Sequence, residues 1–204
     1  MTKNPKTEKV LLLNDEIVHA GFSKTHVLTL RHLRHDDSWS PVITREVYQR
    51  ANAVAVLPYD PVNDRIVLVE QFRPGTWLSG RDPWQFEPPA GMIQDGEDVE
   101  TVARRETMEE AGCEIQDFEP ICQYLVSPGC ATELVHIFCG RVDSETIKMS
   151  FGGNADEHED TRIHILDSSA AIASLSQGCF DYSLTIICLQ WLALHRDDLR
   201  ARWN

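Results

Sequence analysis

Apolar and polar residues alternate along much of the chain, and this pattern predicts β-strands. A period of two is typical of strands with one buried face. The alternation is clearest over residues 25–32, and the apolar run over residues 65–73 indicates a strong central strand. Further strands are predicted over residues 9–14, 41–48, 51–57, 115–124, 134–142 and 161–166. The chain is therefore expected to open with a meander of strands.

Three segments are predicted to be helices. The first runs from Val99 to Ala111 and is followed by Gly112, a typical C-terminal stop. The others cover residues 168–176 and 184–202, and the last has apolar residues on one helical face. Loops are expected over residues 75–83 and 144–160. Strands, a helix after a glycine-rich turn, more strands and a terminal helix together indicate an α/β protein.

The charge of the chain narrows the functional classes. Lys and Arg number 19 against 32 Asp and Glu, which gives a net charge of −13. A chain this acidic is repelled by nucleic acids and by anionic membranes, so neither is expected as a partner. A substrate that bears phosphate would also be repelled, unless metal ions or nearby arginines reverse the sign at its site.

Targeting signals and cysteine motifs add little to this picture. The first ten residues, MTKNPKTEKV, are polar and unlike a signal peptide, and no apolar run approaches the ~20 residues of a membrane span. The six cysteines form no CxxC pair and no zinc-binding spacing with histidines. We therefore expect reduced and mostly buried thiols and a cytoplasmic protein.

The last turn of the helix over residues 99–111 carries an unusual group of carboxylates. Glu106 and Glu110 are four residues apart and share one helix face, and Glu109 adds a third negative charge. Anions are disfavoured at the C-terminal end of a helix. Mg²⁺ would turn this repulsion into a binding site, because it prefers carboxylate oxygens. A solvated acidic helix without a metal is the alternative interpretation.

The spacing around these carboxylates resembles the Nudix box of the Nudix hydrolases. The matching positions are Gly91, Glu97, Arg105, Glu106, Glu109, Glu110 and Gly112. Thr107 and Cys113 depart from the aliphatic residues usual there, but both are packing positions. The resemblance implies a Nudix fold, an α/β/α sandwich with a mixed sheet, over residues 45–204. Residues 1–44 would form a small antiparallel β-sheet that is exchanged between the subunits of a homodimer.

The resemblance also implies a metal site that cleaves diphosphates. Glu106, Glu110 and the Ala90 carbonyl would hold Mg²⁺, with Mn²⁺ as a possible substitute. Glu109 would either bind metal or pair with Arg105. Glu97 would steady Arg105 or the glycine-rich turn rather than touch the metal.

The acidic run over residues 156–160 is the best candidate for a general base. By itself, such a run is typical of a solvated loop. It resembles the D-E-x-E-D segment of the ADP-ribose pyrophosphatases, which implies that Glu157 is the base and Glu159 a metal ligand. Residues two apart in an extended loop face the same side, so both could reach one site. Whether the two exchange roles stays open, and His158 is expected to face solvent.

Substrate-binding residues are expected outside the box. Pro128, Gly129 and Glu133 form an SPG-x-x-x-E unit that resembles the ADP-ribose hydrolases, although Ser-Pro-Gly would also form a simple turn. Glu133 would then bind the sugar. Arg73 and Arg45 are candidates for bidentate phosphate binding, with surface ion pairs as the alternative. Whether Arg45 acts in its own site or in that of the partner subunit stays open. Phe22 would stack on adenine or pack in the core.

The predicted reaction is hydrolysis of ADP-ribose to AMP and ribose 5-phosphate with Mg²⁺. Another nucleoside diphosphate sugar, such as GDP-mannose, is an alternative substrate. A Nudix-fold module that senses a nucleotide without cleaving it is the alternative from a different class. The presence of Glu106, Glu109 and Glu110 favours an enzyme.

Overall fold

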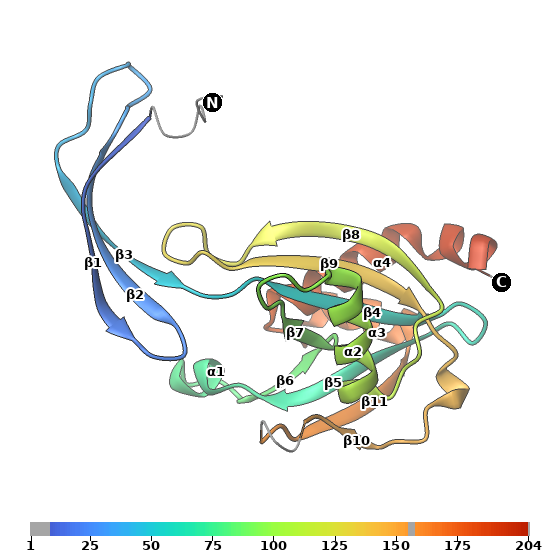
Figure 1. The fold of residues 1–204 in the computed structure, drawn as a ribbon. Coiled ribbons are helices and arrows are strands. Elements are labelled where there is room, and N and C mark those ends of the chain that lie inside the picture. Colours follow the sequence, from blue (N-terminus) through green and yellow to red (C-terminus); the bar gives the residue numbers. More distant parts are fainter. Residues whose placement is uncertain (1–8, 155–157, 204) are drawn as a thin grey trace. The chain divides into compact units, whose positions relative to one another are not determined.

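The computed structural model describes residues 9–154 and 158–203, and the chain divides into two compact units (Figure 1). The first unit is formed by Met1–Asn52 with Tyr124–Leu134, and the second by Ala53–Gln123 with Val135–Asn204. The boundary expected after residue 44 falls inside a strand, β3 (Ile43–Gln49). The first unit also gains a segment from the middle of the chain, which local sequence patterns could not indicate.

The first unit contains a three-stranded antiparallel sheet in the order β1-β2-β3. Its other strands are β1 (Val10–Ala20) and β2 (Lys24–His32). The sequence predicted the sheet but ended β1 at residue 14, because the alternation is lost where two register shifts interrupt its pairing with β2. β1 is exposed along its whole length, and Leu12 and Val18 keep 53% and 54% of their surface accessible.

The segment from Tyr124 to Leu134 pairs with the end of β3 inside this unit. The Tyr48 N–H donates to the Cys130 carbonyl at 2.7 Å, and the Thr132 N–H donates to the Tyr48 carbonyl at 3.1 Å. An ion pair of 3.2 Å joins Arg50 to Glu133. The segment is thereby held through both its backbone and a charged side chain.

The second unit is built on a mixed sheet of eight strands. Six follow the order β10-β11-β5-β4-β9-β8, with β6 beside β5 and β7 beside β4. The bounds are β4 (Ala53–Asp60), β5 (Arg65–Phe72), β6 (Trp84–Glu87), β7 (Ala90–Met92), β8 (Asp117–Leu125), β9 (Leu134–Arg141), β10 (Phe151–Gly152) and β11 (Thr161–Asp167). Because β4 pairs in parallel with β9 and antiparallel with β5, the predicted mixed sheet is confirmed.

Helices cover both faces of this sheet, as the predicted sandwich requires. α2 (Val99–Ala111) lies on one face, and α3 (Ser168–Ser174) and α4 (Ser183–Trp203) lie on the other (Figure 1). Short 3₁₀ turns cover Ser144–Thr146 and Leu175–Gln177. Among the described residues, none of the helices combines the length and apolar character needed to cross a bilayer.

One short helix was not predicted. α1 (Pro74–Leu78) lies where a loop was expected. It begins with Pro74 at its first turn, where the missing N–H of proline costs nothing. Five residues are too few to show a helical period, and none of them is buried, so the hydrophobic pattern carried no signal.

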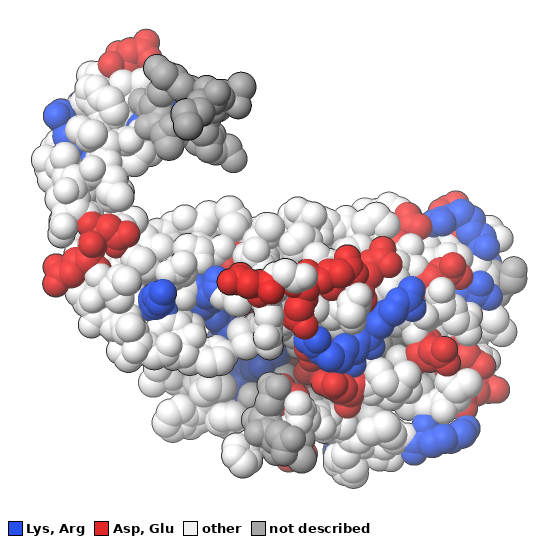
Figure 2. All heavy atoms as spheres, viewed as in Figure 1, with Lys and Arg blue, Asp and Glu red and all other residues white. Residues whose placement is uncertain are grey.

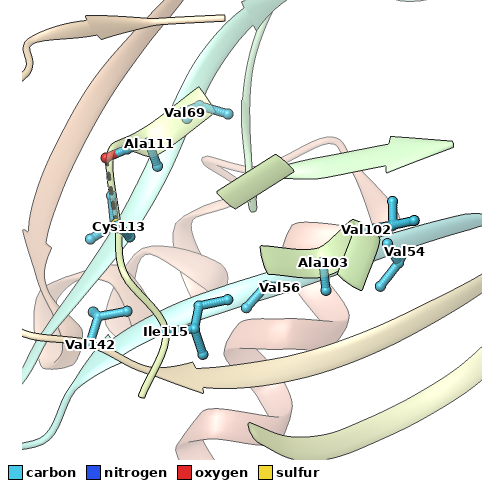
Figure 3. Packing of buried hydrophobic residues seen from close by; sticks show 10 residues of the cluster. Val54, Val56, Val69, Val102, Ala103, Ala111, Cys113, Ile115 and Val142 are labelled. Carbon is cyan, nitrogen blue, oxygen red and sulfur yellow. Dashed lines mark hydrogen bonds between the residues drawn. The ribbon is translucent and has the colours of Figure 1, made fainter. Parts of the chain in front are cut away.

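The core between α2 and the sheet consists of small and branched side chains. Val54 and Val56 of β4 lie against Val102 and Ala103 of α2 (Figure 3). Val69 of β5 belongs to the same cluster. Such residues interdigitate closely, so α2 is fixed at short range above the centre of the sheet.

The six cysteines are all free, but the prediction that most of them are buried is wrong, because they fall into two equal groups. Cys113, Cys139 and Cys188 are buried, whereas Cys122, Cys130 and Cys179 are exposed. Burial raises the pKa of the Cys113 thiol to about 12, so this thiol stays protonated in the folded protein.

Candidate active site

α2 positions the acidic residues that the sequence singled out, and its bounds are those predicted. The Asp98 side chain accepts a hydrogen bond of 3.0 Å from the Thr101 N–H and so caps the first turn. At the other end, Gly112 has a φ of 62°, a left-handed conformation that suits glycine and ends the helix. Thr107 and Cys113 are buried, which confirms that both are packing positions.

Glu110 is the most buried of the expected metal ligands. Only 2% of it is exposed, and its Oε2 accepts a hydrogen bond of 2.9 Å from the Ala90 N–H. Burial raises the pKa of Glu110 to about 8, and the charges of Glu159 and Glu106 add to the shift, against the opposing effects of the Ala90 hydrogen bond and Arg73. The structure therefore brings together Ala90, Glu106, Glu110 and Glu159.

Glu106 lies beside the glycine-rich turn. A Cβ atom on Gly91 would collide with the Glu106 carboxylate, so glycine is needed for the two segments to approach. Burial raises the pKa of Glu106, and the charges of Glu109 and Glu159 raise it further, whereas Arg105 opposes the shift. The two central carboxylates thus share an excess of negative charge.

Glu97 contacts both Arg105 and the glycine-rich turn, as predicted. Arg105 connects Glu97 to Glu106. Its Nη1 donates to Glu97 at 2.7 Å, and its Nη2 donates to Glu106 at 3.1 Å. The Glu97 carboxylate also accepts a hydrogen bond from the Gln94 N–H at 2.9 Å. The suggested pairing of Arg105 with Glu109 is wrong, because the Arg105 guanidinium is occupied by the other two carboxylates. Glu109 is exposed.

The loop after β10 docks on the C-terminal end of α2. Gly153 N–H donates to the Glu109 carbonyl at 3.0 Å, and the Thr161 hydroxyl donates to the Glu110 carbonyl at 3.3 Å. A Cβ on Gly152 would collide with that same Glu110 carbonyl. These contacts hold the ends of the loop that carries Glu159 directly against the helix that carries the carboxylates.

Glu159 closes this loop on itself. Its carboxylate accepts a hydrogen bond of 3.1 Å from the Asn154 N–H, and its own N–H donates to the Asn154 carbonyl at 3.1 Å. The expectation of an extended loop is wrong at His158, which has a φ of 56°. His158 is exposed, as predicted. Glu157, the expected base, lies outside the described residues.

Arg73 is bound to a carboxylate that sequence reasoning missed. Its Nε and Nη2 donate to Glu87 at 2.9 Å and 2.7 Å, and the Glu87 side chain is only 2% exposed. Burial lowers the pKa of Arg73, but the hydrogen bonds and charge of Glu87 outweigh this and hold it above its usual value. A phosphate could therefore reach only the remaining Nη donors, and not the edge of the guanidinium that Glu87 occupies.

The other expected substrate residues belong to the first unit. Phe22 is 81% exposed, so the alternative of core packing is wrong within this chain. Arg45 is exposed, and its Nη1 donates to the Thr44 carbonyl at 2.7 Å. Pro128 and Gly129 lie in an exposed turn closed by the Ala131 N–H and the Ser127 carbonyl at 2.8 Å. Glu133 is paired with Arg50.

The donor set at the end of α2 fits a hard divalent cation. The Glu106 and Glu110 carboxylates have raised pKa values, to which the negative charge of Glu159 contributes, and an oxygen-binding cation relieves such repulsion. No three His, Cys, Asp or Glu side chains within residues 9–154 and 158–203 form a ready-made metal cage. The expected ligand set also includes the Ala90 carbonyl, which is a backbone group and not a side chain.

Acidic residues are also concentrated on the surface around this region. Figure 2 shows Asp and Glu side chains gathered over α2, with basic residues interleaved among them. Among these basic residues, Arg105 forms ion pairs with Glu97 and Glu106.

Two further side chains have a bearing on the site and were not singled out from the sequence. In β6, Gln85 and Glu87 are the buried positions, so the acidic Glu87 side chain lies on the buried face of this strand. Gln71 follows Val67 and Val69 at intervals of two, which places a polar amide on an apolar strand face. In both cases the signal was a polar residue in phase with the buried positions.

Comparison with known proteins gives consistent relatives. Residues 49–174 match the NUDIX domain family. The chain is 38% identical over 194 residues to the ADP-ribose pyrophosphatase of Escherichia coli strain K12, covering 95% of this chain and 92% of that protein. It is 29% identical over 188 residues to the GDP-mannose pyrophosphatase of Escherichia coli strain SMS-3-5, covering 91% and 96%. The crystal structure of an ADP compounds hydrolase has a similar fold, with a TM-score of 0.70, 20% identity and coverage of 95% and 96%.

Proposed function

The chain belongs to the NUDIX family of hydrolases, and from this premise we propose that it cleaves the diphosphate of ADP-ribose to AMP and ribose 5-phosphate. The observation that carries the proposal is the convergence of Ala90, Glu106, Glu110 and Glu159 at the end of α2. The similarity to an ADP-ribose pyrophosphatase extends over nearly the whole chain and supports the choice of substrate.

Mg²⁺ is the cofactor that we propose, with Mn²⁺ as a substitute. Glu106, Glu110, Glu159 and the Ala90 carbonyl would hold it, and the exposed Glu109 could complete the set. When bound, such a cation neutralises a diphosphate and lowers the pKa of water. The residues of the chain do the rest: the Ala90 N–H orients Glu110, and Arg105 orients Glu106.

Proton removal from the attacking water is assigned to Glu157, with Glu159 as the alternative. A general base must come within hydrogen-bond reach of its water. Glu159 is described close to the charges of Glu106 and Glu110, and Glu157 belongs to the same loop. A larger loss of turnover in Glu159→Gln than in Glu157→Gln would exchange their roles.

Substrate binding is proposed to use Arg73 through the Nη donors that Glu87 leaves available. The first unit would add Phe22 for the adenine, Arg45 for phosphate, and Pro128, Gly129 and Glu133 for the ribose side. Glu133 is already hydrogen-bonded to Arg50, so its orientation is set before a sugar arrives.

A homodimer is proposed as the working form. β1 exposes both of its faces, including apolar side chains that a second copy would bury. A cytoplasmic location is supported by six cysteines that all remain free.

The direct test is product analysis with the purified full chain. ADP-ribose is incubated with Mg²⁺, and AMP and ribose 5-phosphate are separated and quantified, with an EDTA reaction as the control. Equal amounts of the two products, formed only with the cation, are expected. Tight binding of ADP-ribose without turnover would instead indicate a nucleotide-sensing module.

GDP-mannose is the alternative substrate, because a GDP-mannose pyrophosphatase also matches over most of the chain. The same assay with GDP-mannose, at matched concentrations, measures kcat/KM for both sugars. A higher kcat/KM for GDP-mannose would reverse the assignment while leaving the reaction class unchanged.

A further inference from the structure

Gln71 is the one described residue with a buried side-chain oxygen or nitrogen that has no hydrogen-bond partner. Only 6% of the residue is exposed, and its Oε1 receives no hydrogen bond. Leaving a buried acceptor unpaired costs free energy, so such atoms are rare and commonly mark a missing ligand or water.

The strand geometry places Gln71 on the face of the sheet that carries the candidate site. Side chains two residues apart share a face, so Gln71 lies with Val67 and Val69, which pack in the same core cluster as α2 residues. Arg73 follows two residues later, and its charge acts on Glu110. Along the strand, Gln71 therefore lies between Val69, which packs in the α2 core, and Arg73.

The neighbours of Gln71 across the sheet are also tied to the site. Thr161 of β11 lies directly opposite it, and the Thr161 hydroxyl donates to the Glu110 carbonyl at 3.3 Å. On the other side Gln85 of β6 lies opposite, and its Nε2 donates to the Asp82 carbonyl at 2.7 Å.

Each of these neighbouring donors already serves another acceptor. Arg73 donates to Glu87, Thr161 to Glu110, and Gln85 to Asp82. None of the three donates to Gln71 Oε1 in the structure, so this buried acceptor is open to a donor from outside the protein. The carboxylates of the site cannot supply it when ionised, because they only accept hydrogen bonds.

We infer that Gln71 is a positioning residue whose Oε1 accepts a hydrogen bond from the hydration shell of the cation held by Glu106 and Glu110. This rests on the proposed function, since it requires that a divalent cation binds at the end of α2. Mg²⁺ and Mn²⁺ keep several waters when bound to proteins, and these waters are donors that need acceptors. Groups in such a supporting role typically contribute ten- to a hundredfold in metal affinity or activity.

The test measures Mn²⁺ affinity without substrate, by electron paramagnetic resonance of the free ion, for the wild-type chain and four variants. Gln71→Met keeps the length of the side chain but removes the acceptor, and it is expected to weaken Mn²⁺ binding by about ten- to a hundredfold. Its melting temperature without metal is expected to be unchanged or higher, because no protein hydrogen bond is lost. A purely structural residue would show the opposite pattern.

The other variants separate the possible causes. Gln71→Glu retains an acceptor and is expected to keep the wild-type Mn²⁺ affinity. Gln71→Asn shortens the side chain by one methylene and is expected to weaken Mn²⁺ binding. Gln85→Met is the matched control from the opposite strand, which loses its bond to Asp82 and is expected to melt earlier with wild-type Mn²⁺ affinity. If Gln71→Met does not fold, Gln71→Asn provides the same comparison.

Three results would overturn the inference. The first is wild-type Mn²⁺ affinity in Gln71→Met or Gln71→Asn. The second is loss of affinity in Gln71→Glu, which would mean that the amide donates instead. The third is a raised KM for ADP-ribose with unchanged Mn²⁺ affinity, which would assign the acceptor to the substrate. A wild-type chain that binds no Mn²⁺ would contradict the proposed cofactor, and is thereby distinguished from failure of the Gln71 role alone.

Discussion

At the scale of single residues, the site combines groups that are individually unfavourable in the folded chain. Glu110 is a buried carboxylate next to other carboxylates, and Gln71 Oε1 is a buried acceptor without a donor. Both features lower stability in the absence of a ligand. The proposed hydrated cation would supply both the positive charge and the hydrogen-bond donors that these residues lack.

Glu110→Gln is expected to separate activity from stability. Loss of one metal ligand should lower kcat by roughly a hundred- to a thousandfold, which corresponds to several kcal/mol of transition-state stabilisation. The unfolding free energy without metal should rise at pH 8. A carboxyl with a raised folded pKa costs stability progressively as pH increases from the unfolded pKa of 4.5 to about 8, and glutamine does not ionise.

The measurement pairs turnover of ADP-ribose with urea unfolding in EDTA at pH 5 and pH 8. The stability gain should be small at pH 5 and on the order of a few kcal/mol at pH 8. A variant with near-normal turnover would contradict the metal-binding role of Glu110. Equal gains at both pH values would contradict the raised pKa.

Asp60 illustrates the opposite case, a buried carboxylate that stabilises the fold. Its two oxygens accept hydrogen bonds from the backbone and side chain of Asn63, from Ser144 and from the Val62 N–H. Burial raises its pKa, but the hydrogen bonds from Asn63 and Ser144 prevail and lower it to about 2.

Asp60→Asn is therefore expected to remove part of the acid sensitivity of the protein. Because the folded pKa is depressed below 3.8, the stabilisation of about 2 kcal/mol is present above pH 4 and is lost as pH falls toward 2. Urea unfolding between pH 6 and pH 2.5 measures this loss, with the exposed Asp197→Asn as the control. The prediction fails if Asp60→Asn and wild type lose stability in parallel.

At the scale of elements, the close docking of the loop after β10 on the end of α2 is the contact most sensitive to added volume. Gly152 leaves no room for a Cβ beside the Glu110 carbonyl, whereas nothing lies within 4 Å of a Cβ on Gly75. The loop and helix must therefore separate if a methyl group is added at Gly152 but not at Gly75.

Gly152→Ala is expected to lower the unfolding free energy by about 1–3 kcal/mol, the usual cost of overpacking, and to reduce turnover because Glu159 moves with the loop. Gly75→Ala should leave both unchanged or slightly improve stability, since alanine is the better helix former. Urea unfolding and ADP-ribose turnover of the two variants test this. Equal behaviour of the two alanines would show that the loop tolerates displacement.

Elements with a strong local signal were predictable from the sequence, and weakly signalled elements were not. The bounds of α2 follow from Asp98 before it and from Gly112 after it. β6 and β7 were not predicted because they are only four and three residues long and Pro88 and Pro89 separate them. The predicted group Ala90, Glu106 and Glu110 was brought together because the family spacing encodes it.

Partners that are distant in the chain were not predictable from local patterns. Arg73 and Glu87 are separated by 14 residues and Arg50 and Glu133 by 83 residues. The sequence does not indicate whether an arginine contacts a carboxylate, a phosphate or solvent, because its partner depends on which strands are paired. This is why the contact between Arg73 and Glu87 was not predicted, and phosphate binding by Arg73 stays a prediction.

At the scale of the whole molecule, the exposed apolar surface of the N-terminal sheet is the observation that supports the proposed homodimer. A three-stranded sheet with an exposed outer strand has little core of its own, and isolated sheets of this kind gain stability by burying a hydrophobic face. The proposed homodimer meets this requirement with a second copy of the same surface.

Leu12→Asp is expected to convert the proposed dimer to a monomer. Leu12 is 53% exposed in the single chain, and a charge buried at an interface without a partner costs several kcal/mol. Sedimentation velocity over a range of concentrations measures the effect. Asn14→Asp adds the same charge at a polar position of β1 and should remain dimeric, and a Leu12→Asp dimer of unchanged affinity would contradict the assignment.

Because three of the six thiols are buried and three are exposed, thiol labelling can measure how often the folded protein opens. A thiol-specific dye should label Cys122, Cys130 and Cys179 at once in the folded chain, because these three are exposed. Cys113, Cys139 and Cys188 become reactive only when the sheet and its helices separate. The rate of the slow labelling phase would thus measure how often the second unit opens, without any engineered probe.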